Sequence, residues 1–232
     1  MRNKSAFWWI HIVFLFAMTA WPILAFAQEA KPDSDELAVG VGDAVKANIA
    51  AMSKYSWRVK TALVKDGESK ATSITEMRFN AEGKIEATNI GGESNVEKKR
   101  GVRGRQQEKK LEDFAAYLEG VLTHSFNYIF LSKGTLVDIF DRAKITQTES
   151  SVEVSAGDLF VKGDELFMSV NPADKLPQKL TFKTTLEKDT ITGTVTYAKI
   201  ENGPNRPTQL EIQIPTQSIK ITSETYDWVA QK

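Results

Sequence analysis

A run of basic residues interrupted by two glycines, from Glu97 to Lys110, is the part of the sequence best suited to binding an anion. Arginine carries forked N–H donors that match phosphate and carboxylate, and glycine lets backbone N–H groups approach an anion closely. The residues predicted to form such a site are Lys98, Lys99, Arg100, Arg103 and Arg105. The alternative is a solvated loop that leads into a helix, because charge runs usually have that role.

A run of aromatic and aliphatic residues, from Phe126 to Leu131, is suited either to filling a core or to lining a cavity for an apolar ligand. It follows a helical stripe that contains Phe114 and Leu118. The residues predicted to line the cavity are Trp57, Phe114, Leu118, Phe126, Tyr128, Phe130 and Phe140. Core filling and cavity lining both stay open on the sequence alone.

Residues that commonly carry catalysis or bind metals are sparse. Beyond the N-terminal apolar segment the chain has one histidine, His124, and the whole chain has no cysteine, so neither a catalytic triad nor a thiolate metal site is indicated. The carboxylates at Asp138, Asp141 and Asp164 lack the spacing of a calcium loop. We therefore expect a protein that is not an enzyme and that uses no metal or cofactor.

The first 27 residues have the organisation of a secretory signal peptide. Arg2 and Lys4 precede an apolar run, and Ala25-Phe26-Ala27 forms a small-x-small cleavage site. The alternative is a retained anchor helix, because the run approaches the roughly 20 residues that span a bilayer; Pro22 and the cleavage site favour removal. The expected organisation is a signal peptide over 1–27, a polar tether over 28–35 and one domain over 36–232, in a protein that is periplasmic or otherwise exported.

The charge balance gives no general reason to bind nucleic acid. Without Arg2 and Lys4 the chain keeps 28 of its 30 basic residues, against 30 acidic ones, and no aromatic residues that could stack on bases are interleaved with the basic run. The partners we expect are a lipid or a lipoprotein acyl chain, and an anionic membrane surface. The oligomeric state is left open.

Hydrophobic periodicity predicts the elements that must position these residues. A helix is expected from about 34 to 53, then three strands in a meander from Tyr55 to Ile90. A helix from about Gln106 and a short second one around 136–143 should follow, and after Val152 the alternation of apolar and polar residues predicts further strands. About eight strands and these helices favour an α+β fold. The expected architecture is a strongly curved antiparallel sheet, an open half-barrel whose concave face is filled by helices.

The second half of the chain resembles a known family. An Asn171-Pro172 turn leads through Lys175-Leu176-Pro177 into a four-strand meander that contains a Gly203-Pro204-Asn205-Arg206-Pro207 turn and closes with a strand from Ile219 to Tyr226. This order is similar to that of the LolA/LolB-like lipoprotein-carrier superfamily. The basic run followed by a helix also resembles an exported bacterial branch with this architecture. The resemblance implies an open half-barrel that holds acyl chains beneath a helical lid, and it implies no particular binding residue.

Two functions follow as expectations. The first is an exported, non-enzymatic protein that carries a lipid or lipidated ligand in an apolar half-barrel cavity. The second is an envelope protein-protein interaction module with a filled core, which uses the basic loop 98–105 or the outer face of the sheet. Trp57 belongs to the more regular face of the first strand and is expected to pack beneath the helices in either case.

Overall fold

The computed structural model describes residues 34–80, 85–95, 101–129 and 131–231, without the side chains of residues 34 and 101–104. Contacts divide the chain into two units, Met1–Lys31 and Pro32–Lys232, and every described residue belongs to the second. The expected signal peptide therefore lies outside the described residues. So do Lys98, Lys99 and Arg100 of the predicted anion site.

The described residues form three α-helices and ten strands. The helices are α1 (Ser34–Met52), α2 (Gly101–Ile129) and α3 (Lys133–Arg142), with a 3-10 turn η1 (Pro215–Gln217). The strands are β1 (Tyr55–Lys65), β2 (Glu68–Phe79), β3 (Ile85–Ser94), β4 (Lys144–Gln147), β5 (Val152–Gly157), β6 (Glu165–Val170), β7 (Pro177–Leu186), β8 (Asp189–Lys199), β9 (Asn205–Ile214) and β10 (Ile219–Ala230).

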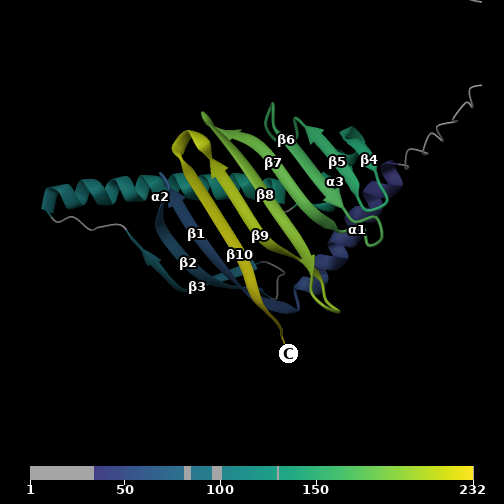
Figure 1. The fold of residues 1–232 in the computed structure, drawn as a ribbon, viewed down its shortest axis with the longest axis horizontal. Coiled ribbons are helices and arrows are strands. Elements are labelled where there is room, and N and C mark those ends of the chain that lie inside the picture. The colour runs from purple at the N-terminus through teal and green to yellow at the C-terminus, as the bar shows by residue number, and fades with distance from the viewer. Residues whose placement is uncertain (1–33, 81–84, 96–100, 130, 232) are drawn as a thin grey trace, which may run out of the picture. The chain divides into compact units, whose positions relative to one another are not determined.

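All ten strands join one antiparallel sheet in the order β3-β2-β1-β10-β9-β8-β7-β6-β5-β4. The sheet is open, with β3 and β4 at its edges (Figure 1). Its first three strands connect to the rest through the pairing of β1 with β10, in which Tyr55 faces Ala230. The first meander and the last strand are thus neighbours at the middle of the sheet.

Alternating side chains give the sheet an apolar face and a polar face. In β7, Leu180, Phe182 and Thr184 are buried while Lys179 and Lys183 are exposed, as expected for an antiparallel sheet with one solvated face. Gly193 of β8 allows a close approach on the buried face, because a Cβ atom there would lie 2.2 Å from the Phe182 ring. That ring in turn stacks on Tyr128 of α2, with centroids 4.9 Å apart.

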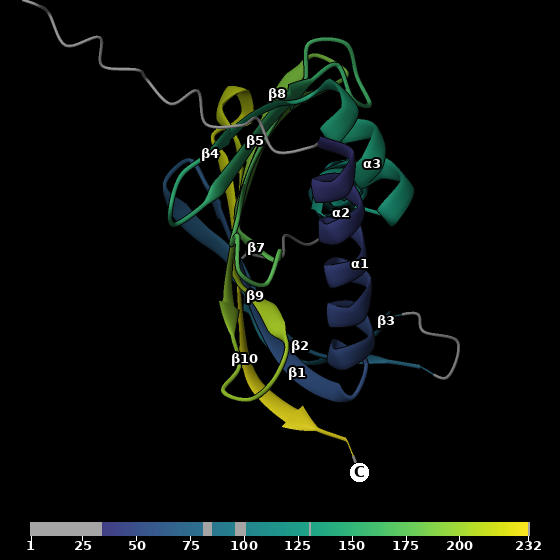
Figure 2. The same ribbon diagram turned by 90° about the vertical axis from the view of Figure 1, so that its right-hand side faces the viewer.

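The three helices lie on the concave side of the curved sheet (Figure 2). Helix α1 approaches α3 and β9, α2 approaches β7 and β8, and α3 approaches β5. Asn48 and Asn205 join α1 to β9 by two reciprocal hydrogen bonds of 2.7 Å. The core between these layers includes Val41, Val121, Tyr128, Leu136 and Phe140 from the helices and Val154, Met168, Leu180, Ile191 and Ile212 from the sheet. The predicted α+β fold, an open antiparallel sheet with helices on its concave face, is confirmed.

Several boundaries differ from those predicted. The described residues contain ten strands instead of about eight, and the short β4 is a strand that was not expected. Helix α2 starts at Gly101 and continues to Ile129, so residues 101–105 of the expected basic loop are helical, and Phe126 and Tyr128 are helical too. The loop prediction was wrong for residues 101–105 because one or two glycines cost a helix only about 1 kcal/mol each. A 29-residue helix has many other hydrogen bonds to offset that cost.

Candidate functional site

The helices cover the concave face of the sheet unevenly. Their close approaches are to β5, β7, β8 and β9, where most of the inward-facing side chains are buried. On the other half of the sheet, Val59 and Leu63 of β1 and Met77 of β2 share the face of Trp57 but are only half-buried. We call the region defined by Trp57, Val59, Met77 and Phe79 the uncovered concave surface, because no close contact of a described helix with β1 or β2 is found there; Leu63, on the same face, packs against the core.

A row of aromatic rings crosses the strands at one end of this surface. Trp57 of β1 stacks face to face on Trp228 of β10, with centroids 4.6 Å apart and an interplanar angle of 4°. Phe79 of β2 flanks Trp57 on one side at 5.6 Å, and Tyr55 lies 6.4 Å from Trp228. Trp57 is only 5% exposed, yet the ring contacts found for it are with these aromatic residues. The predicted burial of Trp57 is thus present, but the prediction that it packs beneath the helices was wrong: its ring partners are Trp228 and Phe79, and the close helix contacts described for the sheet are with β5, β7, β8 and β9.

Arg206 ends the aromatic row. Its guanidinium carbon lies 5.7 Å from the centre of the Trp228 ring, a cation–π geometry. Nη1 donates to the carbonyl and hydroxyl oxygens of Thr225 at 3.3 and 3.2 Å. Nε is buried and finds no hydrogen-bond partner. Arg206 reaches β10 where the β9–β10 ladder has ended, since Gln209 and Glu224 are the last paired residues.

The C-terminal part of α2 is fixed to the sheet by a buried polar cluster. The Tyr128 hydroxyl donates to Asp164 at 2.6 Å and lies 2.8 Å from the Thr184 hydroxyl, which also contacts His124 Nε2 at 3.0 Å. Burial raises the pKa of Asp164, but hydrogen bonds from Tyr128 and from the backbone N–H groups of residues 159–161 outweigh it and hold the pKa below its ordinary value. Burial is the largest cause that raises the pKa of Tyr128, and the hydrogen bond to Asp164 raises it further.

A second tyrosine repeats the arrangement eleven residues earlier on the same helical face. The Tyr117 hydroxyl donates to Asp189 at 2.7 Å, and Thr216 donates to the same carboxylate at 2.6 Å. The hydrogen bonds from Thr216 and Tyr117 lower the pKa of Asp189 more than burial raises it. Two tyrosine–aspartate contacts therefore fix α2 to the ends of the strands. The described residues before Tyr117 include the exposed Arg105, Lys109 and Lys110.

The predicted site residues are divided among different environments. Tyr128 and Phe140 are fully buried in the core, Phe114 and Leu118 are half-buried on α2, and Phe126 is exposed. Phe130 is outside the described residues, and Arg103 lies in α2 without a described side chain. The Lys65 ammonium group lies 4.8 Å from the centre of the Phe114 ring. Sequence reasoning did not single out Arg206, Trp228, Val59 or Met77 as site residues, since their roles depend on the pairing of β1 with β10.

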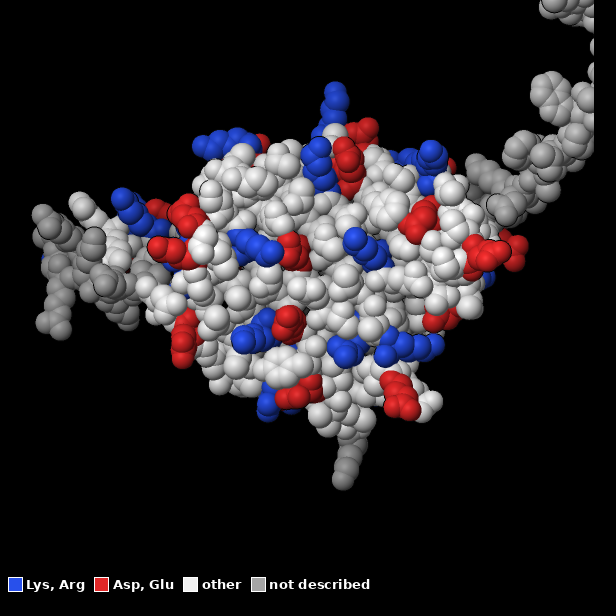
Figure 3. All heavy atoms as spheres, viewed as in Figure 1, with Lys and Arg blue, Asp and Glu red and all other residues white. Residues whose placement is uncertain are grey.

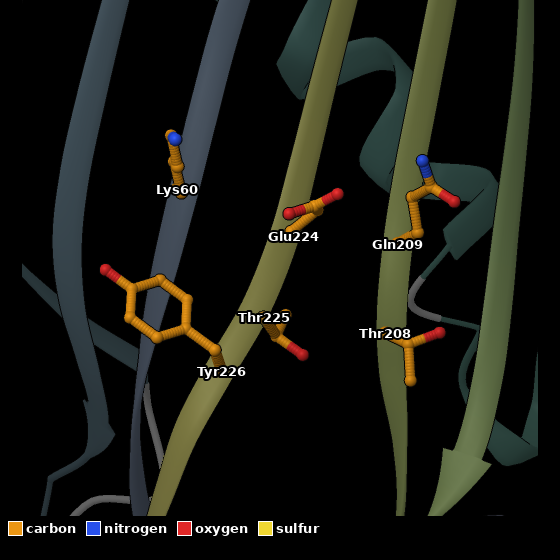
Figure 4. Close-up of a pocket in the computed structure, with 6 residues that line it drawn as sticks. All are labelled: Lys60, Thr208, Gln209, Glu224, Thr225 and Tyr226. Carbon is orange, nitrogen blue, oxygen red and sulfur yellow. The ribbon is translucent and has the colours of Figure 1, made fainter.

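The outer face of the sheet has two shallow depressions. One, of about 480 Å³, lies beside the end of the β9–β10 ladder and is lined by Lys60, Thr208, Gln209, Glu224, Thr225 and Tyr226 (Figure 4). The other, of about 700 Å³, lies over β5 to β8 and includes Phe167, Thr181 and Thr194. Positive and negative side chains are interspersed over this face (Figure 3). The outer face therefore has no dominant charge.

Among the described residues, no group of histidine, cysteine, aspartate and glutamate is arranged to hold a metal ion. Within the same part of the chain, none of the helices combines the length and the apolar character needed to cross a membrane.

No protein-family model and no curated protein matches the chain, but solved structures do. A LolA superfamily protein from Nitrosomonas europaea is 9% identical, with a TM-score of 0.35 over 81% of this chain and 93% of that one. A DUF1329 family protein from Desulfovibrio piger is 11% identical, with a TM-score of 0.38 over 84% and 93%. A domain from Vibrio parahaemolyticus described as an outer membrane lipoprotein-sorting protein is 11% identical, with a TM-score of 0.38 over 85% and 94%. One of the three is described by the name of the superfamily that the sequence resembles. The low TM-scores give no basis for transferring a function, so the function proposed below rests on this chain's own residues.

Proposed function

We propose that this chain is an exported, non-enzymatic binding protein that holds the apolar part of an amphiphile against the uncovered concave surface. The observation that carries the proposal is the contrast between the two halves of the concave face. Where the helices approach the sheet, the core is filled; on β1 and β2, Val59 and Met77 stay half-buried beside an aromatic row. Apolar surface of this kind is stabilised when a ligand removes it from water.

Two stacked tryptophans report directly on this surface. Of the five tryptophans in the sequence, three lie in the expected signal peptide, so Trp57 and Trp228 are the only ones in residues 28–232. Their fluorescence should change when a fatty acid binds, and a brominated fatty acid should quench it. Solvent extraction of the purified protein followed by mass spectrometry would identify any lipid already bound. An empty extract together with unchanged tryptophan fluorescence would refute the proposal.

A pair of variants on one strand separates the concave surface from the outer face. Met77 pairs with Trp57 and shares its face, whereas Ile74 pairs with Lys60 and so belongs to the outer face. We expect Met77→Glu to weaken fatty-acid binding strongly, because it places a charge in the apolar contact. Ile74→Glu puts the same charge on the same strand and should leave binding unchanged. If both variants bind the fatty acid equally well, the uncovered concave surface is not the binding site.

The second candidate is an envelope interaction module that binds a partner protein on its outer face. The observation that favours it is the filled core between the helices and β5 to β9, together with the depressions on the outer face. Under this alternative the protein carries no lipid and does not respond to fatty acids. The extraction and fluorescence measurements therefore distinguish the two candidates.

A further inference from the structure

We propose that Arg206 binds the anionic head group of the amphiphile, so that the preferred ligand is an acid with an apolar chain. This inference rests on the proposed function, because it places the head group at the end of the surface that would hold the chain. It names the ligand as a carboxylate or phosphate amphiphile in preference to a neutral or cationic one.

First, Arg206 has no counterion among the described residues. It is half-buried, and among the described residues no carboxylate forms an ion pair with it. Most other positively charged groups with described contacts are exposed and paired, for example Arg58 with Asp227 and Lys133 with Asp43. A charge that is partly removed from water without a partner is costly. An anionic ligand would supply the missing partner.

The second argument concerns the hydrogen-bond donors of Arg206. Thr225 accepts bonds from Nη1, whereas Nε is buried without a partner and no described residue accepts a bond from Nη2. Nε and Nη2 form one edge of the guanidinium group, and such an edge binds a carboxylate or phosphate through two parallel hydrogen bonds. Buried polar atoms are usually hydrogen-bonded, so an unpartnered Nε calls for an explanation. Because Nε is buried, the groups around it must move when an anion binds to this edge of the guanidinium group.

The third argument is continuity with the apolar surface. The guanidinium group lies against Trp228, Trp228 stacks on Trp57, and Trp57 contacts Phe79. Val59 follows Trp57 on the same face of β1. An amphiphile with its head at Arg206 would therefore have this row of rings beside it to receive its chain.

The experiment compares lauric acid, lauryl phosphate and lauryl alcohol, which share one apolar chain, by tryptophan fluorescence of residues 28–232. We expect an acid to bind about tenfold or more tightly than the alcohol, because a hydrogen bond to a charged group is stronger than one between neutral groups. Whichever acid binds more tightly identifies the head group. Equal binding of acid and alcohol by the wild type would overturn the inference while leaving the proposed function intact, whereas binding of none of the three would contradict the proposed function itself.

Variants then assign the preference to one residue. Arg206→Met should abolish the difference between acid and alcohol, while Arg206→Lys should retain part of it, because lysine keeps the charge but loses the forked geometry. Arg58→Met is the matched control, since it removes an exposed arginine from the outer face of β1; it should leave the preference unchanged. A loss of preference in Arg58→Met equal to that in Arg206→Met would show a diffuse charge effect and overturn the assignment. The wild-type comparison tests the inference even if Arg206→Met does not fold.

Discussion

At the scale of single residues, the cluster of Tyr128, Asp164 and Thr184 sets how firmly α2 is attached. Tyr128→Phe keeps the ring stacked on Phe182 but removes the hydroxyl that contacts Asp164 and Thr184. We expect a loss of about 1–3 kcal/mol in the free energy of unfolding, because a buried hydrogen bond is broken. Urea unfolding measures this. Tyr117→Phe should cost less, since Tyr117 is only half-buried whereas Tyr128 is fully buried; the opposite ranking would contradict the assignment.

The same carboxylate predicts a dependence of stability on pH. The pKa of Asp164 is lower in the folded chain than its ordinary value of about 3.9. Its contribution to stability is therefore fully present above that value and is lost as pH falls through the lower, folded pKa. Asp164→Asn should flatten the decline of the unfolding free energy below about pH 4, measured by urea titrations at several pH values. If the unfolding free energy of Asp164→Asn falls at low pH as steeply as that of the wild type, Asp164 does not contribute to the pH dependence of stability.

Trp57 offers a test of the assigned strand faces. Because Trp57 is 5% exposed, Trp57→Ala should cost about 3–5 kcal/mol in the free energy of unfolding. Val229→Ala, on the neighbouring strand and 59% exposed, should change it by less than about 0.5 kcal/mol. A loss below about 1 kcal/mol for Trp57→Ala, also measured in urea, would mean that the ring leaves its stacked position easily.

At the scale of elements, α2 divides at Tyr117 into an attached part and a part held by fewer contacts. Residues 105–113 are exposed except Gln107, whereas Val121, Ser125 and Tyr128 are buried. Few buried contacts lower the free energy of local opening. Amide hydrogens of residues 105–113 should therefore exchange faster than those of 121–128 in native-state hydrogen exchange. Uniform protection along the helix would show that a partner or ligand covers its first half.

The elements could largely be predicted from the sequence where the alternation was regular. Leu180, Phe182 and Ile191 alternate with polar residues and gave strands close to the observed β7 and β8. Helix α1 was also predicted almost to its bounds. The start of α2 was not predicted, because the sequence around Gly101 and Gly104 has little helix propensity and the helix is stabilised by contacts further along, at Tyr117 and Tyr128.

At the scale of the whole domain, the class and the curved architecture could be predicted, but the pairing of β1 with β10 could not. Local patterns show which face of a strand is apolar, whereas the pairing of β1 with β10 depends on residues far apart in the chain. That pairing brings Trp228 onto Trp57 and places Arg206 beside them. The candidate site is therefore a product of tertiary structure, which is why the sequence pointed to the basic run and the aromatic segment instead.

The basic run provides a prediction about the surface of the protein. Changing Arg100, Arg103 and Arg105 together to alanine should leave stability nearly unchanged, because solvated charges contribute little to it. If the run binds anionic surfaces, binding to anionic liposomes should fall and should also weaken with salt, which screens exposed charges beyond about 8 Å. The matching triple change to lysine should preserve a diffuse electrostatic attraction and abolish a defined pocket. If the alanine variant binds anionic liposomes as well as the wild type does, the basic run is a solvated segment without a binding role.

The central pairing of β1 with β10 also governs when the domain can fold. Tyr55 emerges from the ribosome long before its partner Ala230 has been synthesised, so β1, β2 and β3 must wait for the final strand before they join the rest of the sheet. Pairing between distant segments is slow, because loop closure costs entropy before contacts form. A chain of this topology cannot complete its sheet until β10 has been synthesised. Such a delay would suit a protein that has to be threaded through a translocation channel before it folds.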